Sequence, residues 1–221
     1  MFSTKLILAY WRERYPVSVF VPFAILIAAA GIAAGGSLPT ARDVITSCVL
    51  AYTLILVFRI LDDLADLTND RRRYPSRVLV QSSDLTPIMV LAFLIAAADV
   101  LIILWQPQRA LRLIVLAAVS IFLALWYLLR MRFRAGPLVS AHLILIKYPV
   151  ISLLTCTNWE RLTVNTALPL FGTVYLGICI YEQLHDRAVR ESRGGSWVFA
   201  AEAGLLACLP LLMLLTGGFL R

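Results

Sequence analysis

The sequence predicts an all-α protein, a polytopic bundle of transmembrane helices with about seven spans. Two observations support this prediction. Apolar residues make up 61% of the chain and charged residues only 15%, whereas soluble domains average about 45–50% and about 25%. The apolar residues are also gathered in stretches long enough to cross a bilayer, and short segments between them hold most of the charge. The chain of 221 residues therefore suffices for one membrane domain, residues 1–221.

The chain begins with a segment that is typical of a helix at the membrane surface. Apolar and charged residues alternate between Ser3 and Tyr15, so we assign residues 1–15 to an interfacial amphipathic helix. Seven apolar stretches follow, and we expect each to be a membrane span. They run approximately over Pro16–Gly35, Asp43–Leu61, Pro87–Trp105, Leu111–Leu129, Leu138–Cys156, Thr166–Tyr181 and Trp197–Phe219. The fifth and sixth are the least regular, because a lysine and two prolines interrupt them.

The basic residues indicate how these spans are oriented. With a cytoplasmic N-terminus, 14 Arg and Lys residues fall in cytoplasmic segments, five in outer segments and one inside a span. This distribution agrees with the positive-inside rule. The net charge of +7 is therefore interpreted as topology and phosphate chemistry, and we expect no nucleic-acid partner. The four cysteines are scattered without CxxC spacing, which favours small core residues over a disulfide framework or a zinc site.

Four aspartates lie within nine residues at the expected cytoplasmic end of the second span. Three of them, Asp63, Asp66 and Asp70, are spaced i, i+3 and i+7, so they share one face of a helix and repel one another. A divalent cation such as Mg²⁺ would compensate, since it binds carboxylate and phosphate oxygens together. The arginines that follow at positions 71, 72, 73 and 77 are suited to phosphate oxygens. The alternative interpretation is a solvated acidic loop.

A second acidic pair lies at the end of the sixth span. Glu182 and Asp186 are i, i+4 neighbours on one helix face. With the spans as assigned, this pair falls on the same side of the membrane as the first cluster, so the two can face each other across one cavity. We therefore favour a second site for a metal and a diphosphate. The alternative is a charged helix end in which Asp186 pairs with Arg190.

Few ionisable residues occur inside the expected spans. Lys147 is the clearest, and a cation at that depth is a functional-site hypothesis by default, as a diphosphate ligand or a partner for a carboxylate. Snorkelling is the alternative, but roughly nine residues separate Lys147 from either end of its span. His142 and Tyr148 on the same span are candidates to line a cavity. Asp99 lies in the third span, and we expect it to pair with an arginine near the start of the fourth.

These acidic motifs resemble those of the UbiA superfamily of intramembrane prenyltransferases. That family carries Asn-Asp-x-x-Asp-x-x-x-Asp after its second span and Asp-x-x-x-Asp after its sixth. Here Asp62-Asp63-x-x-Asp66-x-x-x-Asp70 and Glu182-x-x-x-Asp186 occupy the corresponding places. The surrounding Arg59-Ile60-Leu61 and Tyr74-Pro75-Ser76-Arg77 resemble a bacterial branch of the family.

The resemblance covers about residues 16–193 in order and spacing. The sequence departs from the family pattern at Asp62, where the family usually has Asn, and at Glu182, where the family usually has Asp. Both changes keep an oxygen ligand. The family usually has nine spans where we expect seven, and a second copy of the chain or another partner could supply the missing wall.

The resemblance implies an isoprenoid diphosphate substrate, with its head at a cytoplasmic mouth and its tail among helices that membrane lipid surrounds. It implies Mg²⁺ as the cofactor. The implied metal ligands are Asp62, Asp63, Asp66, Asp70, Glu182 and Asp186. The implied catalytic residues are Asp63, Asp66, Asp70 and Lys147. The implied substrate-binding residues are Arg59, Asp62, Arg73, Arg77, Tyr148, Tyr181 and Arg187.

Three functions compete at this stage. The first is a prenyltransferase with an aromatic or lipid acceptor. The second is a terpene cyclase of the same superfamily that needs no acceptor, which the Asp-Asp-x-x-Asp form and the short chain favour. The third is a membrane protein that binds an isoprenoid diphosphate or a partner without catalysis. For all three, the expected location is the inner membrane of a bacterium, with the N-terminus and the mouth of the site facing the cytoplasm.

Overall fold

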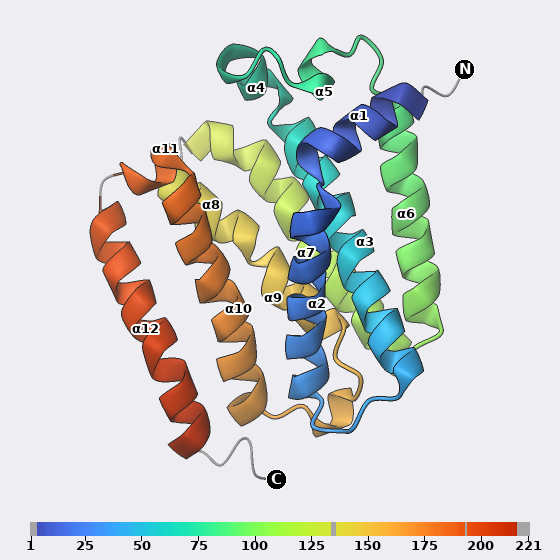
Figure 1. Cartoon of the computed structure of the whole chain (residues 1–221), viewed down its shortest axis with the longest axis vertical. Coiled ribbons are helices and arrows are strands. Elements are labelled where there is room, and N and C mark those ends of the chain that lie inside the picture. Colours follow the sequence, from blue (N-terminus) through green and yellow to red (C-terminus); the bar gives the residue numbers. More distant parts are fainter. Residues whose placement is uncertain (1–3, 134–135, 193, 216–221) are drawn as a thin grey trace.

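The computed structural model describes residues 4–133, 136–192 and 194–215, which form helices packed side by side (Figure 1). Six segments are long and apolar enough to cross a membrane. They are α2 (Val17–Ala34), α3 (Ala41–Ala65), α6 (Thr86–Leu104), most of α7 (Arg109–Phe133), α8 and α9 in succession (Pro137–Leu145 and Lys147–Leu154) and α10 (Val164–His185). The all-α fold class is confirmed, and the six apolar segments indicate an integral membrane protein.

The seventh expected span stays a prediction. Its place is taken by α12 (Gly195–Leu215), which packs against α10. The apolar part of α12 whose side chains the structure describes, Gly195–Leu209, is shorter than a membrane span. The last residues of the expected span, 216–219, and the first three of the expected interfacial helix lie outside the described residues.

The short helices gather mainly at one end of the bundle, which we call the motif end (Figure 1). It carries α1 (Thr4–Arg14), α4 (Leu67–Arg73), α5 (Val78–Gln81) and α11 (Arg187–Arg190), while the 3-10 turn η1 (Trp159–Arg161) lies at the opposite end. Because α3 and α10 both finish at the motif end, the first aspartate cluster and the Glu182–Asp186 pair lie at the same end of the molecule.

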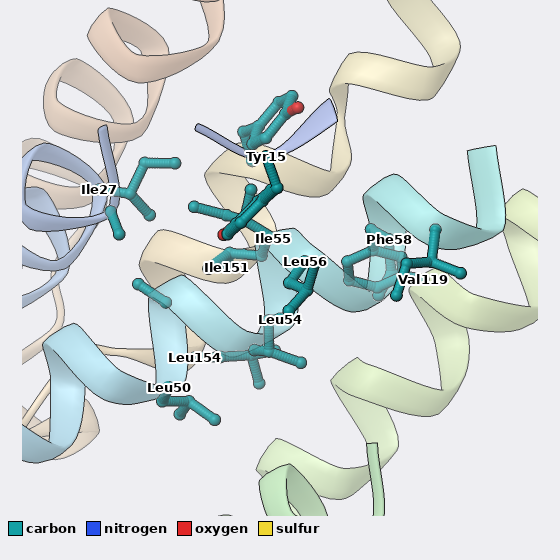
Figure 2. Packing of buried hydrophobic residues seen from close by; sticks show 14 of the residues in the cluster. Tyr15, Ile27, Leu50, Leu54, Ile55, Leu56, Phe58, Val119, Ile151 and Leu154 are labelled. Carbon is teal, nitrogen blue, oxygen red and sulfur yellow. The ribbon is translucent and has the colours of Figure 1, made fainter. Parts of the chain in front are cut away.

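The long helix α3 forms the centre of the core. A capping box starts it, in which the Thr40 hydroxyl accepts from the Asp43 amide while the Asp43 carboxylate accepts from Thr40. Figure 2 shows its apolar side chains, such as Leu54, among residues of neighbouring helices, including Ile27 of α2 and Ile151 of α9. Half of the span of α3 is buried in this way, and the packing holds the end of α3 and its aspartates in a defined position.

The fifth span is broken in the middle. Its two helices, α8 and α9, meet at Ile146, and Lys147 is the first residue of α9. Pro149 accounts for the break, because proline has no amide proton and its ring crowds the carbonyl four residues earlier. The irregularity expected in this span is therefore real, and it places Lys147 at the start of a helix facing the end of α3.

Helices α2 and α9 approach each other closely at Gly31. A Cβ atom at that position would lie 2.1 Å from the Ser152 carbonyl oxygen and 2.3 Å from the Thr155 hydroxyl. Near this contact the Ser152 hydroxyl donates to the Ile27 carbonyl of α2 at 3.1 Å. A small residue at the crossing and a hydrogen bond between helices are the usual means by which membrane helices associate.

The ionisable groups of α6 and α7 do not pair as expected. Asp99 is buried and accepts a hydrogen bond from the Thr53 hydroxyl at 2.5 Å. Arg112 is buried as well, but it donates to backbone carbonyls, at 2.5 Å to Leu154 and 2.6 Å to Cys156. The expected ion pair between Asp99 and an arginine is wrong, because this arginine instead satisfies the free carbonyls at the end of α9.

Candidate functional site

A large cavity of about 1480 Å³ opens beside α2 and α10. Its apolar walls come mainly from these two helices and include Phe20, Phe23, Leu170, Val174 and Ile178. Along α2 the lining extends from Pro16 to Ala33, which is about 25 Å at 1.5 Å per residue and close to the thickness of a bilayer core. The cavity exceeds the usual ~300–1000 Å³ of small-molecule sites, so it suits a long apolar ligand.

Polar side chains line the cavity at the motif end, and we call this group the mouth. The mouth consists of Glu13, Arg14, Arg59, Arg73, Tyr74, Tyr181, Glu182, His185, Asp186, Arg187 and Glu191. Four of these eleven residues are arginines. Beyond the mouth, Tyr148 and Thr173 are the only described lining residues with a polar side chain. The cavity therefore combines a charged head region, in which four arginines lie among four carboxylates, with an apolar interior.

Arg59 is the residue of the mouth that has a buried hydrogen-bond donor without a partner among the described residues. It lies near the end of α3, where its Nε atom is 3.6 Å from Asp63, too far for a good hydrogen bond. That Nε atom is buried and has no hydrogen-bond partner among the described residues. A buried donor without an acceptor is costly. The Nε atom faces Asp63, but the Arg59 side chain as a whole is 31% exposed and lines the mouth, so its guanidinium group is available to an anionic ligand there.

Asp63 is held by three side chains rather than facing the cavity. It accepts from the Tyr10 hydroxyl at 2.9 Å and from Arg14 at 3.0 and 2.5 Å, and Arg59 lies alongside. Burial raises the pKa of the Tyr10 phenol well above its ordinary value, and the Asp63 charge acts in the same direction. Tyr10 is therefore a fixed hydrogen-bond donor. Asp63 serves in this arrangement as the anchor that ties α1 to the end of α3.

Asp62 points to the other side of α3. It accepts hydrogen bonds from the Tyr127 hydroxyl of α7 and from the Lys147 ammonium of α9. Lys147 is buried, so this pair neutralises two charges that would be expensive to leave alone in an apolar bundle. Lys147 was expected to be either a diphosphate ligand or the partner of a carboxylate, and in the structure it is the partner of the Asp62 carboxylate.

Asp66 and Asp70 each have a basic partner of their own. Arg130 of α7 donates to Asp66 at 2.5 Å, and Arg77 pairs with Asp70. Burial raises the pKa of the Asp66 carboxyl above its ordinary value, with Asp62 and Asp70 acting in the same direction and Arg130 against them. α3 ends at Ala65, so Asp66 lies at a junction between two helices, and the continuous helical face expected for three aspartates is interrupted.

The second acidic pair lies on the cavity itself. Glu182 and Asp186 both line the mouth, and neither forms an ion pair with a described residue. Asp186 caps α11 by accepting from the Ala188 amide at 2.7 Å. The expected alternative, an Asp186–Arg190 pair, is not formed, because Arg190 donates to the Leu184 carbonyl instead. Glu182 also lies in the electrostatic field of Arg59.

The structure thus divides the candidate site residues into two groups. Those that line the cavity are Arg59, Arg73, Tyr148, Tyr181, Glu182, Asp186 and Arg187. Those that lie outside its lining, each in an ion pair with an oppositely charged residue, are Asp62, Asp63, Asp66, Asp70, Arg77 and Lys147. Sequence reasoning missed Arg14, which both anchors Asp63 and lines the mouth. Its position at the end of an amphipathic segment was the available signal.

His142 is not a lining residue. Its Nε2 atom lies 2.6 Å from Glu202 of α12, on a part of the bundle that the cavity does not include. Tyr148, the other candidate on that span, does line the cavity.

Comparisons of this chain with protein-family models, with curated proteins and with solved structures found no match. The resemblance to the UbiA superfamily therefore rests on the motifs and their places in the bundle.

Proposed function

We propose that this protein is an intramembrane prenyltransferase, which ionises an isoprenoid diphosphate with Mg²⁺ and transfers the prenyl group to an acceptor. The proposal rests on one observation above all: a cavity of about 1480 Å³ with apolar walls has arginines at its mouth, among them Arg59, whose side chain is 31% exposed. A diphosphate with a long hydrocarbon tail matches both parts of that cavity. The arrangement of the acidic motifs at the same end supports the same ligand.

The arginines of the mouth would bind and orient the diphosphate. Arg14, Arg59 and Arg73 come from three different segments, and guanidinium groups donate in a planar fork that fits phosphate oxygens. Asp63 keeps Arg14 and Arg59 at the mouth. When the carbon–oxygen bond breaks, the diphosphate leaves with the bonding electrons, and the donors stabilise its added charge. The apolar walls exclude water from the allylic cation until an acceptor attacks it.

The oxygen ligands of the mouth fit Mg²⁺ only in part. Glu182 and Asp186 are one helical turn apart, line the cavity and lack ion-pair partners among the described residues, so this pair would hold the ion. Bound Mg²⁺ would supply further neutralisation of the diphosphate. The four aspartates of the first cluster do not fit as they lie, because each already has a basic partner. A metal-binding role for them would require those ion pairs to open.

That complete pairing favours one second candidate, a protein that binds isoprenoid diphosphates without reacting them. In this case the first cluster would serve only to hold the arginines and helices in place. Both candidates predict binding at the mouth. They differ in whether diphosphate is released.

The test uses the full chain purified in detergent, with geranyl, farnesyl and geranylgeranyl diphosphates and Mg²⁺. Binding, released diphosphate and extracted products are measured, first without an acceptor and then with a membrane-lipid extract. The Arg59→Gln variant should bind the diphosphates about 10- to 100-fold more weakly, because a charge-assisted hydrogen bond contributes about 1.5–3 kcal/mol. The matched control is Arg109→Gln, an exposed arginine at the opposite end of the bundle.

Release that needs the lipid extract would support the transferase. Release without an acceptor would identify the acceptor-free cyclase instead. Binding without release of diphosphate under either condition would support the non-catalytic binding protein. Equal binding by wild type, Arg59→Gln and Arg109→Gln would contradict a diphosphate site at this mouth. Glu182→Gln addresses the metal. It should abolish the Mg²⁺ dependence, whereas Glu160→Gln, at the far end of the molecule, should not.

A further inference from the structure

Three side chains from three helices converge on the side of α10 away from the cavity. They are His142 of α8, Cys179 of α10 and Glu202 of α12, and their ligand atoms all lie within 4.8 Å of one another. None of the three belongs to the lining of the cavity. Cys179 and Glu202 are buried and His142 is partly buried. The proposed function makes no use of this cluster.

All three residues lie at a similar depth in the bundle. His142 is five residues from the start of α8, Cys179 six from the end of α10 and Glu202 seven from the start of α12. At 1.5 Å per residue these positions are about 8–11 Å from the motif end of their helices. Glu202 is also the single acidic or basic residue in Gly195–Leu209. An acidic residue in so apolar a helix is expensive and indicates a specific partner.

The neighbours of the cluster orient it. The Nδ1 atom of His142 lies 2.7 Å from the Leu138 carbonyl, which can only accept, so Nδ1 carries the proton and Nε2 is turned toward Glu202 at 2.6 Å. The Gln183 amide donates to the second oxygen of Glu202 at 2.5 Å. A histidine held through one nitrogen and a carboxylate held by a hydrogen bond are typical of the groups that surround a metal site.

One buried atom next to the cluster lacks a partner. Gln183 is 2% exposed, and its Oε1 atom has no hydrogen bond to any described residue although its Nε2 donates to Glu202. A buried amide oxygen without a donor is unusual. A fourth ligand position on a metal ion, or the proton of a water bound there, would satisfy it.

We propose that His142, Cys179 and Glu202 bind a Zn²⁺ ion. Imidazole, thiolate and carboxylate are the ligands that zinc takes, and three of them leave the fourth tetrahedral position for water or for Gln183. Two ligand atoms about 2.1 Å from a tetrahedral ion lie roughly 3.4 Å apart. The His142 Nε2 and Glu202 Oε1 atoms, now 2.6 Å apart, would therefore move away from each other by less than about 1 Å when zinc binds. Binding forms the three metal–ligand bonds. It releases the thiol proton of Cys179 and the proton between His142 and Glu202.

The ion would fasten α12 to the rest of the bundle. Among the described elements, α12 packs against α10 and α11. The contact between Glu202 and His142 also joins α12 to α8. Zinc would replace that single contact by a bridge across three helices. The site does not depend on the cavity, so the inference stands whether or not the proposed function is right.

The experiment measures zinc in the full chain, purified in detergent, loaded with Zn²⁺ and dialysed. Cys179→Ser and His142→Gln are compared with Cys208→Ser, which removes an exposed cysteine of α12 outside the cluster. We expect about one zinc per chain in wild type and in Cys208→Ser, and at least a tenfold weaker affinity in the other two. Added Zn²⁺ should raise the melting temperature of the wild type and of Cys208→Ser only, because a ligand that binds the folded state stabilises it.

A second measurement needs no variant. Co²⁺ in place of zinc should give a thiolate-to-metal charge-transfer absorption in the wild type, which reports a cysteine ligand even where a substitution prevents folding. Less than one zinc per chain in the wild type would overturn the proposal. Equal zinc binding by all four proteins, or a Co²⁺ complex without thiolate absorption, would also overturn it, because either result would identify the metal as an adventitious ion only. Mg²⁺ dependence at the mouth should be the same in wild type and Cys179→Ser, which separates this site from the proposed function.

Discussion

Replacing Asp63 by asparagine tests what holds α1 on the bundle. The Asp63 carboxylate accepts from Tyr10 and Arg14, and the side chains of Arg14 and Asp63 are only 17% and 7% exposed. Removing one partner of a buried ion pair costs about 3–5 kcal/mol. Asparagine keeps the size of the side chain and one acceptor oxygen, so we take the lower end, about 3 kcal/mol. Nearly all of this loss falls on the contact between α1 and α3.

The assay is amide hydrogen exchange across α1 by mass spectrometry. A loss of about 3 kcal/mol makes detachment of α1 roughly a hundredfold more frequent, and exchange in Thr4–Arg14 should accelerate by that factor. The matched control is Glu13→Gln on the same helix, which weakens one exposed hydrogen bond to the Val78 amide and should change exchange by less than about tenfold. If Asp63→Asn accelerates exchange no more than Glu13→Gln does, the ion pair does not anchor α1.

Two further predictions concern contacts inside the bundle. Gly31→Val should lower the free energy of unfolding by about 1–3 kcal/mol, because a Cβ there would lie 2.1 Å from a backbone oxygen of α9. The control is Gly177→Ala, because a Cβ atom at Gly177 would have no neighbour within 4 Å. Equal melting temperatures for the two variants in detergent would contradict the close approach of α2 and α9 at Gly31. Lys147→Met should cost about 3 kcal/mol by leaving Asp62 without its cation. Adding Asp62→Asn should recover part of that loss, and a purely additive double variant would show that the two are not coupled.

The bundle itself could be predicted from the sequence to a large extent. Long apolar stretches dictate membrane helices because backbone groups in lipid must bond within their own segment. The break near Lys147 also has a local cause, the proline two residues later, and α8 and α9 meet where that proline requires. Such features depend on a window of a few residues, which is what a sequence pattern reports.

The partners of the first aspartate cluster could not be predicted. Spacing on one helix suggested that Asp63, Asp66 and Asp70 share a face and a common ligand. Their actual partners, Arg14 and Arg130 among them, come from helices far away in sequence. Which cation reaches which carboxylate depends on how α1 and α7 pack against the end of α3, and nothing in the spacing of the aspartates encodes that packing.

By itself, therefore, the sequence determined which segments are apolar helices and which of them carry charge, because composition and periodicity act locally. The tertiary structure decided which charges meet. It placed Arg59 at the mouth of a cavity and enclosed Asp63 away from it, although the two are one turn apart on α3. It also brought together His142 and Glu202, which are 60 residues apart. The physical reason is that electrostatic and hydrogen-bond partners are selected by distances of a few ångströms, which only the packing of helices sets.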